Sequence, residues 1–199
     1  MRIALVVAGL FAVCQVSPLS AQWHIGLGVG RDVYSGVSQG DFEDGSGSFR
    51  PYRPLVWSLR VEGHVSQPRL SVTFRYATPD IALVGEDLTL IPQGSFLEMA
   101  GAALTAGWTL IQLTPGVTIE GEAGPTIERW RVEDADDRTL LGVTGNLAIR
   151  IDLGGRFSAR LSARMGMTPK SPLAGALIEG YTPRAGWRRG LEAGVLLSL

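Results

Sequence analysis

The sequence predicts an all-β fold, an eight-stranded antiparallel up-and-down barrel. Three observations predict it. Apolar and polar side chains alternate with a period of two in eight stretches, as expected when successive side chains leave opposite faces of a strand. Long and short connections alternate between these stretches. The polar faces carry paired Arg and Glu residues in place of the Lys, Asn and Gln that are typical of a wet surface.

The first three predicted strands cover residues 22–31, 55–64 and 69–77. Each has apolar side chains at every second position. In the second of them the opposite face is polar and consists of Ser58, Arg60, Glu62 and His64. A tight turn at 65–68 joins the second strand to the third, whereas long connections at 32–54 and 78–94 follow the first and the third. Within 78–94, the segments 81–84 and 88–91 are predicted to form short strand extensions above the barrel.

The remaining predicted strands cover 95–106, 115–131, 140–153, 156–167 and 187–199. The fourth is less regular, with Leu97 and Met99 opposite Glu98, and we interpret 108–111 as part of the next connection. Gly154 and Gly155 form a two-residue hairpin signal between the sixth and seventh strands. The other connections are an acidic loop at 133–137 and a long loop at 168–186. The longer connections therefore fall mostly on one rim of the barrel.

The N-terminus has the pattern of an export signal. Arg2 precedes a short apolar run at 3–13, and small residues ending at Ala21 offer a cleavage site. We predict a cleaved signal peptide over 1–21 and one barrel domain over 22–199, in preference to a buried N-terminal helix. Cys14, the one cysteine, lies in the predicted signal, so the mature chain would form no disulfide. The net charge of −1 indicates no nucleic-acid partner.

Charges balance on the predicted polar faces, where seven arginines accompany seven acids. The arginines are Arg60, Arg75, Arg150, Arg156, Arg160, Arg164 and Arg188, and the acids are Glu62, Glu98, Glu120, Glu122, Glu128, Asp152 and Glu192. A lumen of low dielectric needs such balance, because an unpaired buried ion is very costly. We therefore predict a transmembrane barrel with apolar side chains facing lipid and charges inside. The alternative is a soluble periplasmic barrel whose apolar face surrounds an apolar ligand.

The five tryptophans fall near predicted strand ends, where indole rings suit the headgroup level of a bilayer. We predict an aromatic girdle with Trp57, Trp130 and Trp187 at the loop rim, and Trp23 and Trp108 at the turn rim. Strand length agrees with a membrane barrel, since about eleven residues at ~3.3 Å each, tilted roughly 40°, cover an apolar band of ~25 Å.

With its export signal, eight amphipathic strands and apolar last strand, the chain resembles the small outer-membrane β-barrels of Gram-negative bacteria, the OmpA-like and OmpX-like barrels. The resemblance covers about 22–199. It implies a location in the bacterial outer membrane and contact with outer-membrane lipid and lipopolysaccharide. It also implies that the barrel-insertion machinery reads the last strand, which commonly ends in an aromatic residue in that family and ends here in Leu199. We expect a monomer.

The main predicted site is a closed, salt-bridged lumen. An eight-stranded barrel is just wide enough inside for its own side chains, so its charges would satisfy one another where no bulk water enters. The predicted lumenal network consists of Arg60, Glu62, Arg75, Glu98, Glu120, Glu122, Arg150, Asp152, Arg160, Arg164, Arg188 and Glu192. The functional alternative is a narrow path for water, ions or small solutes through the same charges.

Arg129 and Arg131 flank Trp130 and point away from the lumen in the predicted register, so we predict that they contact lipopolysaccharide phosphates. The predicted role is structural, or surface contact through the long loops. We predict no catalytic site, because acyl transfer or deacylation of lipid A, the enzymatic alternative, needs a histidine beside a loop-rim serine. His24 and His64 lie at the turn rim instead. We predict no cofactor and no metal site.

Overall fold

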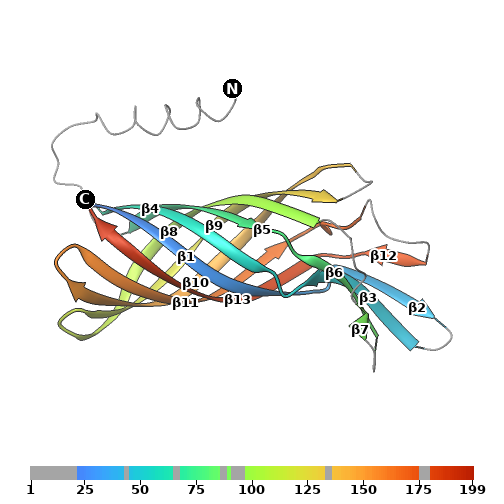
Figure 1. The fold of residues 1–199 in the computed structure, drawn as a ribbon, viewed down its shortest axis with the longest axis horizontal. Coiled ribbons are helices and arrows are strands. Elements are labelled where there is room, and N and C mark those ends of the chain that lie inside the picture. The colour runs from blue at the N-terminus through green and yellow to red at the C-terminus, as the bar shows by residue number, and fades with distance from the viewer. Residues whose placement is uncertain are drawn as a thin grey trace.

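A computed structural model describes residues 22–42, 45–64, 68–85, 89–90, 97–132, 136–174 and 180–199. The predicted signal peptide, 1–21, lies outside these residues. Eight strands form a closed antiparallel barrel in the order β1-β13-β11-β10-β9-β8-β5-β4 (Figure 1). This arrangement confirms the predicted fold class. Over the described part of the chain, no helix is long and apolar enough to cross a bilayer.

Three barrel strands, β1, β8 and β10, are longer than the sequence pattern predicts, and the other five lie within two residues of their predicted bounds. Their bounds are β1 Gln22–Ser35, β4 Leu55–His64, β5 Arg69–Ala77, β8 Leu97–Thr114, β9 Val117–Val132, β10 Arg138–Gly154, β11 Phe157–Thr168 and β13 Gly186–Ser198. The prediction that 108–111 form a connection is wrong, because β8 continues through them. Register shifts between Thr109 and Ile111, and between Gln112 and Thr114, interrupt the alternation of faces there.

The long connections form a second sheet beyond the barrel, hereafter the external sheet. It consists of β2 Ser38–Phe42, β3 Gly45–Tyr52, β6 Asp80–Val84, β7 Thr89–Leu90 and β12 Tyr181–Pro183. These strands lie in the order β12-β2-β3-β6-β7, at the end of the barrel opposite the C-terminus (Figure 1). We call that end the loop end and the other the turn end. β6 and β7 match the predicted extensions, whereas β2, β3 and β12 were not predicted.

The barrel turns its apolar faces outward. In β11, Leu161 is 54 % exposed, whereas its neighbours Arg160 and Ser162 are buried. The same alternation covers the other barrel strands, and leucines such as Leu27, Leu141 and Leu147 are exposed on the outer surface. The alternative of a soluble barrel with an apolar cavity is therefore wrong, because the charged face is inside.

Glycines on the inner face of β1 leave room for those charges. Gly28 faces the lumen, where a Cβ atom would lie 2.6 Å from the Ser58 hydroxyl and 3.1 Å from a carboxylate oxygen of Glu192. A side chain at Gly28 would therefore displace lumenal groups. This close approach explains why glycine alternates with apolar residues in the first strand.

Candidate functional site

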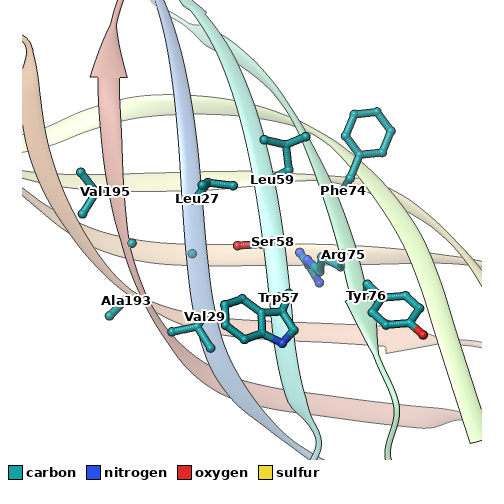
Figure 2. A pocket seen from close by; sticks show the side chains of 12 residues that line it. Leu27, Val29, Trp57, Ser58, Leu59, Phe74, Arg75, Tyr76, Ala193 and Val195 are labelled. Carbon is teal, nitrogen blue, oxygen red and sulfur yellow. The ribbon is translucent and has the colours of Figure 1, made fainter. Parts of the chain in front are cut away.

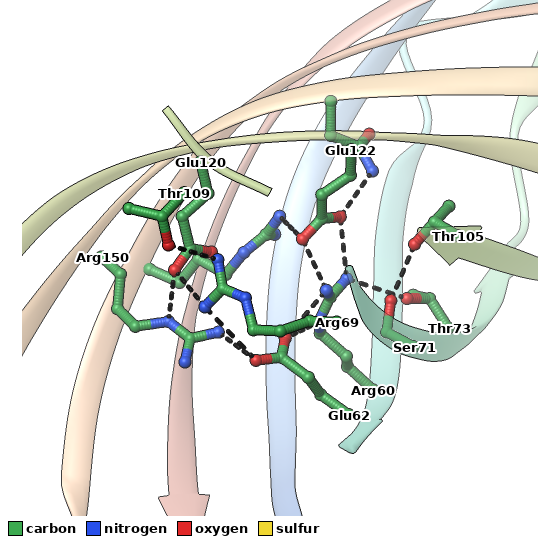
Figure 3. A network of polar contacts seen from close by, with 12 residues as sticks. Arg60, Glu62, Arg69, Ser71, Thr73, Thr105, Thr109, Glu120, Glu122 and Arg150 are labelled. Carbon is green, nitrogen blue, oxygen red and sulfur yellow. Dashed lines mark hydrogen bonds and ion pairs between the residues drawn. The ribbon is translucent and has the colours of Figure 1, made fainter. Parts of the chain in front are cut away.

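The lumen nearer the turn end contains four arginines and three glutamates, which we call the turn-side cluster. Its members are Arg60, Glu62, Arg69, Glu120, Glu122, Arg150 and Arg160. They come from five strands, β4, β5, β9, β10 and β11. Figure 3 shows the side chains of Arg60, Glu62, Arg69, Glu120, Glu122 and Arg150 pointing toward one another. Each is at least nine-tenths buried at its side chain.

Each glutamate of the turn-side cluster binds at least two arginines. Glu62 accepts a hydrogen bond of 2.9 Å from Arg60 and one of 2.5 Å from Arg150. Glu122 lies 2.5 Å from the Arg60 guanidinium and 3.0 Å from that of Arg160. Because every carboxylate bridges cations from different strands, the cluster ties the barrel wall together across its interior.

Glu120, whose side chain is fully buried, has the same arrangement. It lies 2.6 Å from Arg69 and 3.1 Å from Arg150. Hydroxyls surround the cluster, and Ser71 and Thr105 share a hydrogen bond of 2.7 Å on the lumenal faces of β5 and β8. The turn-side cluster is thus a set of bridged ion pairs bordered by neutral polar groups.

A second set of charges, the loop-side cluster, lies nearer the loop end and consists of Asp32, Arg75, Glu128, Arg164, Arg188 and Glu192. Asp32 is 2.7 Å from Arg164 and 3.6 Å from Arg188. Two further close ion pairs join Arg164 to Glu192 and Arg188 to Glu128. Arg75 is buried but forms no ion pair with any residue that the structure describes, and its Nε atom has no hydrogen-bond partner there.

Between the loop-side cluster and the external sheet, a group of apolar side chains, which we call the plug, fills the loop end of the barrel. It consists of Tyr34, Val37, Val56, Ala77, Leu97, Met99, Trp130, Val132, Leu140 and Leu173, with Phe49 and Ile81 packed against them. The Trp130 ring is fully buried and meets Tyr34 edge to face, with ring centroids 5.6 Å apart. Its indole N–H donates a 3.2 Å hydrogen bond to Glu128. Trp130 therefore joins the plug to the charged layer below it.

Three predicted placements are wrong at the strand ends. Glu98 does not face the lumen but lies on the outer surface, 3.2 Å from Arg131, with 39 % of its side chain exposed. Trp130 belongs to the plug and not to the aromatic girdle. Asp152 is exposed at the turn end of β10, where the strand has left the lumen.

The first two errors have one physical cause. Within the lipid band the outer surface must be apolar and the lumen can be polar. Beyond the lipid band the outer surface is in water, and the plug makes the interior apolar. The side chains still alternate with a period of two, but here the apolar ones face inward and the polar ones face outward. Leu97 and Met99 accordingly point inward, on either side of the outward-facing Glu98.

The structure buries the remaining predicted lumenal residues inside the barrel, except that Glu192 is only partly buried, with 11 % of its side chain exposed. Sequence reasoning missed Asp32 and Arg69. Asp32 follows the predicted end of the first strand by one residue, and Arg69 is the first residue of its strand. Both occupy positions of the polar face, so extending the alternation of polar and apolar positions beyond the predicted strand ends would have found them. Arg156, one of the seven arginines assigned to the polar faces, is also exposed.

Arg129 and Arg131 lie on the outer surface, as predicted from their register, but neither is free. Both arginines donate to the exposed Asp137, at 2.5 Å from Arg129 and 3.4 Å from Arg131. The hydrogen bond from Arg129 holds the pKa of the Asp137 carboxyl below its usual value. These cations are therefore already neutralised by acids of the same rim.

Four tryptophans have exposed rings on the outer surface: Trp23, Trp57, Trp108 and Trp187. Trp57 and Trp187 lie on the loop half of their strands, and Trp23 and Trp108 on the turn half. Among the described residues, no group of three or more His, Cys, Asp or Glu side chains could hold a metal ion. Two serines near the predicted loop rim were possible nucleophiles for acyl transfer: Ser171 is buried and accepts a hydrogen bond from the Leu173 amide, and Ser95 lies outside the described residues.

Comparison with solved structures identifies the fold. Neisserial surface protein A superposes with a TM-score of 0.63 at 11 % identity, over 89 % of this chain and 97 % of that one. The chain has the fold of a small outer-membrane β-barrel. Lower similarity is found to Ail of Yersinia pestis (TM-score 0.44, 11 % identity, 89 % and 99 % of the chains) and to the N-terminal β-barrel domain of Pseudomonas aeruginosa OprF (TM-score 0.44, 8 % identity, 87 % and 97 %). No family model and no curated protein sequence matches the chain.

Proposed function

We propose that this chain is a resident outer-membrane barrel with a closed lumen, and that it acts as a rigid scaffold for the external sheet. The observation that carries the proposal is the layered filling of the lumen. Two bridged ion-pair clusters fill the part that crosses the apolar band, and the apolar plug closes the loop end. We also propose a non-catalytic role, because acyl transfer needs a histidine beside a loop-rim serine, whereas His24 and His64 belong to the turn-end parts of β1 and β4.

Residual space inside the barrel supports a closed lumen. One small cavity is bordered by Arg60, Arg160 and Glu192 and another by Tyr34 and Trp130, and each measures about 10 Å³. A volume of that size holds about one water molecule. A continuous water column would need the ion pairs to separate, and each separation exposes buried charge without a partner.

The external sheet is held together by contacts between its own strands and is joined to the barrel through Arg50 and through Phe49 and Ile81, which pack against the plug. Ser38 in β2 both donates to the Phe49 carbonyl and accepts from the Phe49 amide, at 2.8 and 2.7 Å. Arg50 in β3 donates to the carbonyl of Tyr34 in the plug, at 3.3 Å. Edge-to-face packing of Phe49 against Tyr181 joins β3 to β12, with ring centroids 4.6 Å apart. A sheet fixed in this way presents one surface to a partner, and binding residues are commonly found on such supported loops.

The closed lumen is tested by planar-bilayer recording of the refolded chain. We expect no steady single-channel steps at neutral pH, because both charged clusters and the plug block the axis. Heat-modifiable mobility on gels, measured on the same vesicles, shows that the barrel is folded. The contradicting result would be steady single-channel steps whose conductance changes in Arg160→Ala or Glu120→Ala but not in the outer-surface variant Glu98→Ala. It would show that ions pass through the lumen.

Display of the external sheet is tested by an epitope placed in the connection between β2 and β3. Intact cells should bind the antibody as strongly as permeabilised cells. The matched control carries the same epitope at Gly154-Gly155, in the turn between β10 and β11, and should be labelled only after permeabilisation. The opposite result for the two insertions would reverse the proposed orientation of the barrel.

A further inference from the structure

Two arginines project from the outer surface of adjacent strands into an apolar environment. Arg31 in β1 and Arg189 in β13 are both exposed. In the ladder of these strands Arg31 is opposite Leu191 and Arg189 is opposite Val33, which makes the two arginines diagonal neighbours on one face. Both lie on the loop half of their strands, where an outer-leaflet headgroup would be.

Among the residues that the structure describes, no acid pairs with either arginine. The cross-strand neighbours of Arg31 are Leu55 and Leu191, and those of Arg189 are Val33 and Met165. Within the described part of the chain, neither arginine takes part in an ion pair or a side-chain hydrogen bond. Like charges at diagonal positions repel, and a cation on the lipid side of a barrel is costly. An anion between the two guanidinium groups would remove both costs.

The contrast with the rim pair of Arg129 and Arg131 is direct. Those two arginines share Asp137, and Arg131 also binds Glu98. Their positive charge is already matched by carboxylates of this chain. Arg31 and Arg189 are likewise exposed but have no such partner in the described part of the chain, so they are the better site for an anion from outside the chain.

An apolar groove lies on the same outer face, and its lining includes Val29, two residues before Arg31 in β1. Its volume is about 620 Å³, and it runs across β13, β1, β4 and β5 (Figure 2). Val29, two residues from Arg31 on the same strand face, and Ala193 opposite it form part of the floor. Trp57 and Tyr76 line the groove nearer the loop end, and Leu59 and Phe74 line it further down. The small side chain of Ala193 makes part of this hollow.

We propose that Arg31 and Arg189 bind a phosphate of lipopolysaccharide, with acyl chains of the same molecule lying in the groove over Val29, Trp57 and Ala193. Paired guanidinium groups suit phosphate because each can donate two parallel hydrogen bonds to its oxygens. The aromatic rings of Trp57 and Tyr76 suit the boundary between headgroup and acyl chain. This inference rests on the proposed outer-membrane location and names the lipid-binding surface of the barrel.

The test measures binding of bisphosphorylated lipid A to the full chain, refolded in nanodiscs of neutral lipid. Arg31→Gln/Arg189→Gln should weaken binding about tenfold, whereas the matched double variant Arg129→Gln/Arg131→Gln should change it less than about twofold. Dephosphorylated lipid A should bind the unchanged chain about tenfold more weakly and should not distinguish these variants. Ala193→Trp, which fills the groove and keeps both arginines, should also weaken binding severalfold.

Three results would overturn the inference. Loss of binding in the Arg129/Arg131 variant alone would assign the phosphate to the rim pair. Full competition by inorganic phosphate would make the pair a free-phosphate site, without a role for the groove. Equal affinity of all variants for lipid A would remove the site altogether. None of these three results contradicts the proposed function, provided that the chain remains folded and non-conducting. Failure of the unchanged chain to insert into bilayers would contradict the proposed function itself.

Discussion

Replacing Glu62 by Gln should lower the free energy of unfolding of the barrel by about 3–5 kcal/mol, the usual cost of removing one partner from a buried ion pair. Glu62 is 1 % exposed and lies 2.9 Å from Arg60 and 2.5 Å from Arg150. Gln keeps the shape and removes the charge, so both guanidinium groups lose a buried counter-ion. The measurement is equilibrium unfolding in urea of the chain reconstituted in lipid vesicles, followed by tryptophan fluorescence.

Two comparisons separate this effect from a general loss of charge. Glu98→Gln removes an acid from the exposed pair with Arg131 and should cost at most about 1 kcal/mol. Arg75→Met removes the lumenal arginine that lacks an ion pair in the described structure and should be close to neutral. If Glu62→Gln is no more costly than Glu98→Gln, the lumenal network does not hold the barrel together.

Coupling within the network gives a further check on the same substitution. The described lumen holds seven buried arginines and six acids, so Glu62→Gln increases an existing excess of positive charge. Removing the positive charge of Arg150 as well returns the excess of positive charge in the lumen to its original value. The double variant Glu62→Gln/Arg150→Gln should therefore lose less stability than the sum of the two single variants. Simple additivity would indicate that the two side chains do not interact.

Replacing Leu59 by Arg should cost about 2–4 kcal/mol and block assembly of a large fraction of the chain, because a charge at the bilayer midplane of a barrel is poorly solvated. Leu59 is 41 % exposed near the middle of β4, between Leu27 and Phe74 on the same outer face. The measurement is the fraction of heat-modifiable, protease-resistant barrel after folding into vesicles.

Position on the strand provides the control for Leu59→Arg. Leu153 is 60 % exposed at the turn end of β10, where the cost of Arg should fall to about 0–1 kcal/mol. Leu59→Ala removes the same side chain without adding charge and should assemble normally. Normal assembly of Leu59→Arg, or equal failure of Leu59→Ala, would show that this surface does not face lipid.

The sequence predicted the barrel well because the membrane band imposes one rule on every strand. A period of two located eight strands and gave the correct side to Arg60, Leu59 and Leu161, since a bilayer outside and ion pairs inside leave little freedom. The external sheet was harder to predict, since β2 and β3 are short and rich in Gly and Ser and lie outside that band. Their pairing depends on the barrel that supports them.

The strand ends could not be predicted from alternation alone. The period of two does not show at which residue of a strand the apolar side chains stop facing lipid and begin to face the plug. Whether Glu98 and Trp130 face outward or inward depends on that residue. Partners in the lumen are equally hidden, because Arg60 and Glu122 are 62 residues apart and meet through barrel closure. A single strand shows that a charge faces inward, but the shear of the barrel decides which charge it meets.

Spin labelling along β11 tests the inside-out arrangement most directly. Single cysteines are introduced at residues 157–165 of a Cys14→Ser chain, labelled with a nitroxide and measured in lipid vesicles for collision with oxygen and with a water-soluble nickel complex. We predict strong oxygen access at Leu161 and Ala163, weak access at Ser162 and Arg164, and a strict period of two. Greater access to oxygen at Ser162 and Arg164 than at Leu161 and Ala163, or no alternation at all, would contradict the placement of the charges inside the barrel.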